Sequence, residues 1–597
     1  MTNKKFKLCI TMAGAVSAGA YTAGVLDYLL ETLHLWEIAK ENNRKIGQGN
    51  PGYDNSIPMH EVEIDVISGA SAGGITGTLA VLNLLDKNYN HYNRENPKGE
   101  NNRFYKSWVK MADDDKEITL SKMLHRDDIK AGEKPESLLN TKAIESIADE
   151  ALLIKEQKNY PKYISKNLDL ILTISNLRGI NFKVDFDGRS HNSSGTTITN
   201  HGGFFRYKTV NNSYPDRGIP KENDSLYHVL DLKNQTDISV LRNATLSTSA
   251  FPIGLKSRQL NIYTEYLNRY PKYLFGKDRL HAISPILKNE KLYHFNSIDG
   301  GLINNEPYGI ALKVMHEKNA NILKNQDKNY AVIMVDPFPN LNSTEENYTP
   351  KSDIISVVKG MFKALRNQVM FNQDGILEAL SLSDRTKFLI APIRKEKIEG
   401  KWVRAQNDLA SAPLNGFAGF LDESFREHDF KLGRQNCQTF LRYYFAVKDE
   451  NIQSRLQSDP TNEAKDRFSF SVPPKDPNAN KFYPIIPDVR LLNAFKDISD
   501  KENYGSDAKI HYPKYPKFDT KRFEKTFKTP VKRRISYVVK GISNSRMLTF
   551  GFNRLFKNKA YNYIKNTIEK ELEEAQLIRK DLFKNKNSDI EISEFSL

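Results

Sequence analysis

A serine flanked by glycines is the first candidate for chemistry. Residues 69–73 read Gly-Ala-Ser-Ala-Gly, which fits the G-x-S-x-G pattern of a nucleophilic serine on a sharp turn between a strand and a helix. The strained backbone at such a turn needs small neighbours, which Gly69 and Gly73 supply to Ser71. We expect Ser71 to act as a nucleophile. The structural alternative is a tight turn whose serine caps the next helix.

A second glycine-containing loop, residues 13–19, is a candidate for binding negative charge. It lacks the Lys-Ser/Thr pair that ends a Walker phosphate loop, and neither glycine turn contains the G-x-G-x-x-G fingerprint of dinucleotide sites. Backbone N–H groups at a helix start suit the oxyanion of an acyl-transfer intermediate instead. We therefore expect an oxyanion hole at Gly14, Ala15 and Val16, with a glycine turn needed only for packing as the alternative.

A serine nucleophile needs a base, and the sequence offers two kinds. One is a histidine late in the catalytic domain, as in α/β-hydrolases, for which the candidates are His294, His316 and His428. The other is Asp299, which ends a predicted strand and is followed by Gly300 and Gly301. A carboxylate that is hydrogen-bonded to a serine can take its proton, so a Ser71/Asp299 dyad also satisfies the chemistry.

Alternating strand and helix patterns supply the elements that must position these residues. Short apolar runs predict buried strands, and leucines at helical spacing predict a helix after each of the first two. This alternation is typical of an α/β fold with a mostly parallel central sheet. The predicted strands are residues 6–12, 63–68, 168–175, 293–298, 330–335 and 387–393, and the predicted helices include residues 26–33, 75–85, 353–373, 416–445 and 564–582.

Together, and in this order, these motifs resemble the patatin-like phospholipases. The family's D-G-G-x-x-x-N-x-P element is matched at every fixed position, by Asp299, Gly300, Gly301, Asn305 and Pro307, and the similarity covers roughly residues 6–340. The resemblance implies a three-layer α/β fold, a Ser71/Asp299 dyad, an acyl-enzyme intermediate, and no metal or other cofactor. It implies hydrolysis of fatty-acyl esters in membrane phospholipids, an activity of the phospholipase A type.

One residue departs from the family pattern. Ala18 stands where the usual first loop, G-G-G-x-[R/K]-G, carries a basic residue. Backbone amides survive this change, so the loop can still stabilise an oxyanion. Loops without the basic residue occur in long bacterial patatin-related proteins, which this chain also resembles in having a large C-terminal extension.

The length of 597 residues predicts more than one structural unit. We expect a patatin-like catalytic domain at 1–345, a helical extension packed on it at 346–455, a Pro-rich connector at 456–510, and a basic aromatic segment with a terminal amphipathic helix at 511–597. The C-terminal extension should therefore be largely helical. Within it, the charged stretch 425–434 has two interpretations. Arg426, Asp429 or Arg434 could contact a lipid head group, or ion pairs could fasten the extension to the catalytic domain, which we favour.

The net charge of +15 is concentrated near the C-terminus. Residues 514–565 hold 15 Lys and Arg against two acids, a charge of +13, so the rest of the chain carries +2. Aromatic residues alternate with these cations, which suits an anionic membrane surface where rings enter the interface. We expect a separable basic platform that binds anionic phospholipid. A nucleic-acid-binding scaffold is the less favoured alternative.

Two segments of the sequence bear on the location of the protein in the cell. Residues 1–20 have cations before an uncharged stretch, but glycines interrupt it, so a secretory signal is the less favoured interpretation. Residues 66–85 are uncharged and contain four glycines, which favours a buried strand, turn and helix over a membrane span. With only two cysteines, a reducing compartment is the simpler expectation. We predict a cytoplasmic protein, peripheral on the inner face of the membrane, whose oligomeric state the sequence leaves open.

Overall fold

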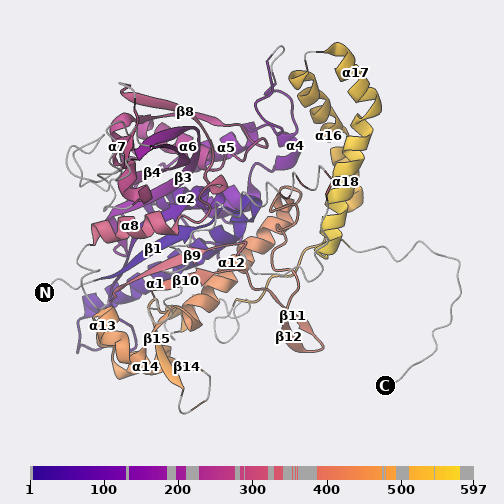
Figure 1. Cartoon of the computed structure of the whole chain (residues 1–597). Helices are drawn as coiled ribbons and strands as arrows, with labels where there is room; N and C mark the ends of the chain where they lie inside the picture. The colour runs from indigo at the N-terminus through magenta and orange to yellow at the C-terminus, as the bar shows by residue number, and fades with distance from the viewer. Residues whose placement is uncertain are drawn as a thin grey trace, which may run out of the picture.

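The computed structural model describes residues 5–93, 95–129, 133–184, 196–209, 228–275, 283–287, 290–319, 328–339, 386–472, 479–491, 510–543 and 545–578, with a few isolated positions besides. This part of the chain forms a layered α/β fold in which helices cover both faces of one large sheet (Figure 1). A helical C-terminal region packs against this body.

Within these residues the central sheet has ten strands. Its middle is parallel, in the order β10-β9-β1-β2-β3, and β4 and β5 continue it beyond β3. The antiparallel strands β7 and β8 pair with β3, and β6 pairs with β8. The strands are β1 (Phe6–Met12), β2 (Val62–Gly69), β3 (Ile164–Val184), β4 (Thr196–Thr209), β5 (His228–Leu230), β6 (Arg258–Tyr263), β7 (Ile283–Pro285), β8 (Leu292–Asp299), β9 (Tyr330–Val335) and β10 (Lys387–Ile390).

The helices that position the site follow the sheet's central strands. β1 and β2 are almost fully buried because helices lie over both of their faces. The helices of this body are α1 (Gly19–Ile46), α2 (Ala72–Leu85), α3 (Arg103–Tyr105), α4 (Thr119–Met123), α5 (Lys142–Ala151), α6 (Gln235–Thr248), α7 (Thr264–Phe275) and α8 (Tyr308–Lys318), with short helical turns η1 (Val16–Ala18), η2 (Lys106–Lys110) and η4 (Gly300–Leu302).

The extension is joined to the catalytic body by α12 (Glu423–Tyr443), which crosses α1 at very short distance. A β-carbon on Gly24 would lie 1.9 Å from the Phe430 carbonyl oxygen, and one on Gly433 would lie 2.1 Å from the Tyr21 carbonyl oxygen. Glycine at both positions therefore lets the two helix backbones touch.

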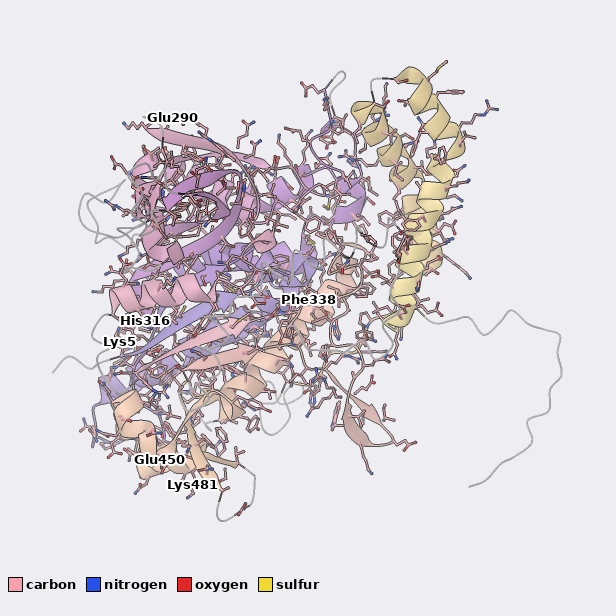
Figure 2. All side chains as sticks on the ribbon, in the orientation of Figure 1. Lys5, Glu290, His316, Phe338, Glu450 and Lys481 are labelled. Carbon is pink, nitrogen blue, oxygen red and sulfur yellow. The ribbon has the colours of Figure 1, made fainter. Side chains whose placement is uncertain are left out.

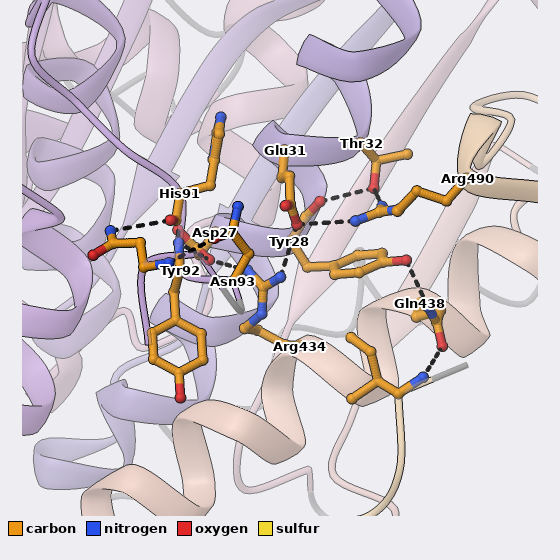
Figure 3. Close-up of polar contacts among 12 residues, drawn as sticks. Asp27, Tyr28, Glu31, Thr32, His91, Tyr92, Asn93, Arg434, Gln438 and Arg490 are labelled. Carbon is orange, nitrogen blue, oxygen red and sulfur yellow. Dashed lines mark hydrogen bonds and ion pairs between the residues drawn. The ribbon is translucent and has the colours of Figure 1, made fainter. Parts of the chain in front are cut away.

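Buried ion pairs fasten the same crossing (Figure 3). Arg434 of α12 pairs with Asp27 and, at 2.7 Å, with Glu31 of α1. Arg490 also contacts Glu31, at 2.9 Å, and its Nε pairs with Asp488 at 2.7 Å. Burial raises the pKa of Glu31, but the two arginines outweigh it and hold the pKa at about 2. Fastening by ion pairs, the interpretation we favoured for the 425–434 stretch, is thus confirmed for Arg434.

The rest of the extension forms small sheets and a C-terminal helical group. β15 (Asn480–Pro484) pairs with β13 (Ala446–Lys448) and β14 (Phe470–Val472), and β11 (Lys395–Ile398) forms a hairpin with β12 (Lys401–Arg404). Short helical turns η5 (Ala418–Phe420), η6 (Asp449–Asn451), η7 (Val489–Leu491), α13 (Ile452–Leu456) and α14 (Asn462–Phe468) connect these parts. The last helices, α16 (Thr520–Ile542), α17 (Arg546–Leu555) and α18 (Lys557–Glu574), stand together along one side of the body, with α17 at their outer end (Figure 1).

Most predicted elements are present, with shifted ends. β1 and β9 have the predicted bounds, and residues 66–85 form strand, turn and α2. The predicted strand 387–393 ends at Ile390, and the predicted helix 416–445 begins only at Glu423 because Asp422 caps it by accepting the Ser424 N–H. The prediction for 353–373 falls almost wholly outside the described residues. In the described part, no helix combines the length and apolar character needed to cross a bilayer.

The division of the chain into four units stays a prediction, but the structure shows how parts of two of these units pack. Residues 480–491, inside the range predicted as a connector, are packed into the body through β15 and Asp488. The basic segment is not separable as expected, because Phe523 and Phe527 of α16 and Leu572 of α18 share a buried cluster with Leu421 and Phe425.

Candidate active site

Ser71 lies at the turn between β2 and α2 in the conformation expected of a nucleophile elbow. Its backbone has φ 51° and ψ −121°, a region that residues with a side chain rarely adopt. A β-carbon on Gly69 would lie 2.3 Å from the Gly73 carbonyl carbon, and one on Gly73 would lie 2.3 Å from the Met12 carbonyl oxygen. Both glycines are therefore required by close backbone approach, as the sequence predicts.

Ser71 and Asp299 meet across the end of the sheet. The Ser71 hydroxyl donates to Asp299 Oδ2 at 2.5 Å, and both side chains are buried, with 7% and 6% of their surface exposed. Asp299 stands at the last position of β8, and its Oδ1 accepts the Gly301 N–H at 2.7 Å. The Ser71 N–H donates to Thr248 Oγ1 at 3.0 Å. This arrangement allows the carboxylate to receive the serine proton.

The glycines after Asp299 are needed for the turn that aims its carboxylate. A β-carbon on Gly300 would lie 2.2 Å from the Thr173 carbonyl oxygen of β3, and one on Gly301 would lie 2.6 Å from Asn305 Oδ1. Any larger residue would push this turn away from β3 or from Asn305. The D-G-G motif thus has a structural reason at each position.

The first glycine loop lies beside Ser71. A β-carbon on Gly14 would be 2.9 Å from Ser71 Cβ, which shows how closely the loop approaches. The Gly14 N–H donates to the Asn305 carbonyl at 3.3 Å, whereas the amides of Ala15 and Val16 have no hydrogen-bond acceptor among the described residues. Val16 has φ 50°, a strained value for a branched side chain. Of the three predicted donors, Ala15 and Val16 are therefore the ones with unoccupied N–H groups.

An apolar cavity begins at the two side chains. Its lining includes Ser71, Asp299 and Val16, and then consists mainly of aliphatic and aromatic side chains from α2, α5, α6, η2 and η5. The apolar lining includes Ile75, Leu79, Leu82, Trp108, Ile144, Ile147, Leu246 and Phe420, and also Phe251, which follows α6, and Phe417, which precedes η5. The apolar lining of this cavity suits a hydrocarbon chain.

The histidines proposed as alternative bases are elsewhere. None of the described histidines lines this cavity. His428 is buried in α12, where its ring contacts the Asp429 carboxylate at 2.8 Å. His294 is exposed on β8. His316 lies on α8, far from the carboxyl ends of the parallel strands, which Phe338 marks because it follows β9 there (Figure 2). Asp299 is thus the candidate base that reaches Ser71.

Two further carboxyl groups, on Glu306 after the Gly300–Gly301 turn and on Asp336 after β9, have perturbed pKa values. Burial raises the pKa of Asp336, just after β9, to about 6. Burial, together with the negative charge of Asp336, raises the pKa of Glu306 to about 7. A negative charge on either carboxyl group is therefore unfavourable, because burial favours the protonated form of both.

The sequence analysis missed four residues that contribute to the site. It assigned no role to Thr248, to Ser17 in the first loop, or to Phe417 and Phe420 of the extension. Thr248 and Ser17 carry no pattern that separates them from ordinary polar residues. The two phenylalanines lie more than 340 residues from Ser71 in sequence, and only the tertiary fold brings them to it.

An α/β fold with a hydroxyl–carboxylate pair beside an apolar cavity suits a lipid acyl hydrolase. A sequence model described as patatin-like phospholipase matches residues 10–312, and the chain belongs to this family. It is 28% identical to the uncharacterized protein y4iI of Sinorhizobium fredii, over 95% of this chain and 81% of that protein. The crystal structure of VipD from Legionella pneumophila aligns over 99% of this chain and 94% of its own, with 12% identity and a TM-score of 0.17, a likeness too low to carry an argument.

Proposed function

We propose that the protein hydrolyses fatty-acyl esters of membrane phospholipids, an activity of the phospholipase A type, through a Ser71/Asp299 dyad. The observation that carries this proposal is the 2.5 Å hydrogen bond from the Ser71 hydroxyl to Asp299 at one end of an apolar cavity. A hydroxyl, a buried carboxylate and a hydrocarbon site together match the needs of lipid ester cleavage.

The proposed reaction has two halves. Ser71 Oγ attacks the ester carbonyl carbon while its proton passes to Asp299 Oδ2, and the Ala15 and Val16 amides donate to the resulting oxyanion. The intermediate collapses, the lysophospholipid oxygen leaves with the proton from Asp299, and an acyl group remains on Ser71. Water then attacks this acyl group and gives a proton to Asp299. The proton returns to Ser71 Oγ as the fatty acid departs.

We further propose that an anionic phospholipid surface binds the C-terminal helices, within the predicted segment 514–565. The structure divides the aromatics of this segment into two groups. Phe523 and Phe527 are buried in the core, whereas Phe550 and Phe556 have 67% and 51% of their surface exposed. With Met547, which is 86% exposed, they provide apolar side chains around α17 among cations. This binding would make the protein peripheral on a membrane.

The experiment for the dyad compares lipid products by mass spectrometry after incubation with phospholipid vesicles. Wild type should release fatty acid and lysophospholipid, and Ser71→Ala and Asp299→Asn should not. Ser68→Ala is a matched control, because Ser68 is buried on β2 and its hydroxyl has no hydrogen-bond partner among the described residues. Full activity of a folded Ser71→Ala variant would contradict the proposal.

A further inference from the structure

A segment of the extension lies against the first glycine loop and the cavity at once. We call residues 410–421 the bracing segment. Gly416 of this segment has φ 90°, and a β-carbon there would be 3.1 Å from the Ala15 carbonyl oxygen. The segment and the first loop are therefore in direct backbone contact, although about 400 residues separate them in sequence.

Ser17 connects the two segments by three hydrogen bonds. Its N–H donates to the Gly416 carbonyl at 3.1 Å, and its hydroxyl donates to the same carbonyl. The hydroxyl oxygen also accepts the Gly419 N–H at 3.0 Å. Ser17 is fully buried, and a β-carbon on Gly419 would lie 2.5 Å from its oxygen. Ser17, which directly follows Ala15 and Val16, thus holds the loop that carries their amides in place.

The bracing segment is itself fixed by charged residues of α12. The buried Asp429 carboxylate accepts the N–H groups of Ala410 and Ser411 at 2.8 and 2.9 Å. Arg426, also buried, donates to the Gly419 carbonyl at 2.6 Å and pairs with Asp113 at 2.6 Å. These two side chains therefore act on the protein backbone, and the alternative that they contact a lipid head group is wrong for both.

The same segment lines the apolar cavity. Phe417 and Phe420 belong to its wall, and the Phe417 ring packs edge-on against Phe251 with centroids 5.1 Å apart. Phe251 follows α6 in the catalytic body, so the two parts of the chain close this wall together.

We infer that the bracing segment completes the active site: Ser17 is a positioning residue that holds the oxyanion loop through Gly416 and Gly419, and Phe417 is a specificity residue that sets acyl-chain preference. This inference rests on the proposed function of the Ser71 site. It also explains how a loop with Ala18 in place of a basic residue is held in position.

The first test is Ser17→Ala, with Ser411→Ala as its matched control. Ser411 is buried in the same segment, but its hydroxyl has no hydrogen-bond partner among the described residues. With a soluble p-nitrophenyl ester, Ser17→Ala should lower kcat by about tenfold to 10²-fold with KM little changed, because the amides are misplaced for the transition state. Equal kcat for the two folded variants would overturn the role of Ser17.

The second test is Phe417→Ala, with Phe470→Ala as control, since Phe470 is equally half-buried but lies on β14, away from the cavity. The ratio of the hydrolysis rates of p-nitrophenyl palmitate and octanoate should change by about tenfold in Phe417→Ala and stay unchanged in Phe470→Ala. The reason is that each buried methylene of the acyl chain is worth about fourfold in binding. An unchanged ratio in Phe417→Ala would overturn its role.

A binding measurement separates this inference from the proposed function. In the Ser71→Ala background, affinity for a fluorescent long-chain fatty acid should fall about tenfold on adding Phe417→Ala. If wild type hydrolyses no ester yet this affinity falls, the proposed reaction fails and the cavity assignment stands. If wild type hydrolyses esters through Ser71 while both Ser17→Ala and Phe417→Ala behave like their controls, only the present inference fails.

Discussion

Removal of positive charge around α17 should selectively weaken binding to anionic vesicles. Lys540, Arg554 and Lys559 are exposed cations that flank the exposed Met547 and Phe550 in sequence. Each cation close to an anionic leaflet contributes about 1 kcal/mol, so replacing all three by glutamine should cost about 3 kcal/mol, or about 10²-fold in partitioning. Substituting the exposed Met547 and Phe550 by serine should add to this loss.

The assay is vesicle co-sedimentation with phosphatidylserine-containing and pure phosphatidylcholine vesicles at low and high salt. The matched control removes three exposed lysines, Lys395, Lys397 and Lys401, from the β11–β12 hairpin, which lies at the other end of the extension from α17 (Figure 1). The two variants have equal net charge, so only position differs. Binding to anionic vesicles should fall in the α17 variant alone, and most strongly at low salt, because salt screens exposed charges. Equal losses in both variants would refute the argument that α17 is the contact site.

Three further predictions concern stability. Arg434→Met should destabilise the fold by about 3–5 kcal/mol, because Asp27 and Glu31 stay buried without this partner. In thermal unfolding, the double variant Asp27→Asn/Arg434→Met should recover part of the lost stability. No recovery of stability would contradict the pairing of Asp27 with Arg434. Gly433→Ala should lower the unfolding temperature through its clash with Tyr21, at a cost of about 1–3 kcal/mol, whereas Gly551→Ala, with open space around it, should not. Because the pKa of Asp336 is raised from 3.8 to about 6 in the fold, its ionisation lowers stability as pH rises through this range, with the full contribution present only below pH 3.8. Asp336→Asn should therefore stabilise by about 3 kcal/mol more at pH 8 than at acid pH, and equal effects at both would refute this.

The pairing of Ser71 with Asp299 could be predicted from the sequence because its geometry depends on nearby glycines. Gly69 is fixed by a backbone contact within its own turn, and Gly73 and Gly300 by close approach of their turns to Met12 and Thr173, so the requirement leaves a short pattern around Ser71 and Asp299. The central strands β1 and β9 could also be predicted from the sequence, since strands that are buried on both faces consist mostly of apolar residues. Ends were harder to place, as for α12, where one capping aspartate decides the start.

Long-range contacts could not be read from the sequence. Ser17 hydrogen-bonds to Gly416, and Phe417 faces Phe251, without any periodicity that links these positions. The basic aromatic segment shows the same limit, because Phe523 and Phe550 both belong to the predicted basic stretch but have opposite burial in the fold. Composition predicted an anionic surface as partner, and only packing could divide buried rings from exposed ones.

The central claim, that Ser71 is the nucleophile, is tested most directly by trapping the acyl-enzyme. Wild type and Ser71→Ala would be mixed briefly with an activated long-chain ester, quenched in acid, digested and mapped by peptide mass spectrometry, with Ser68→Ala as control. We expect one acyl adduct, on Ser71, in wild type and Ser68→Ala and none in Ser71→Ala. An adduct on another residue, or undiminished turnover without Ser71, would contradict it.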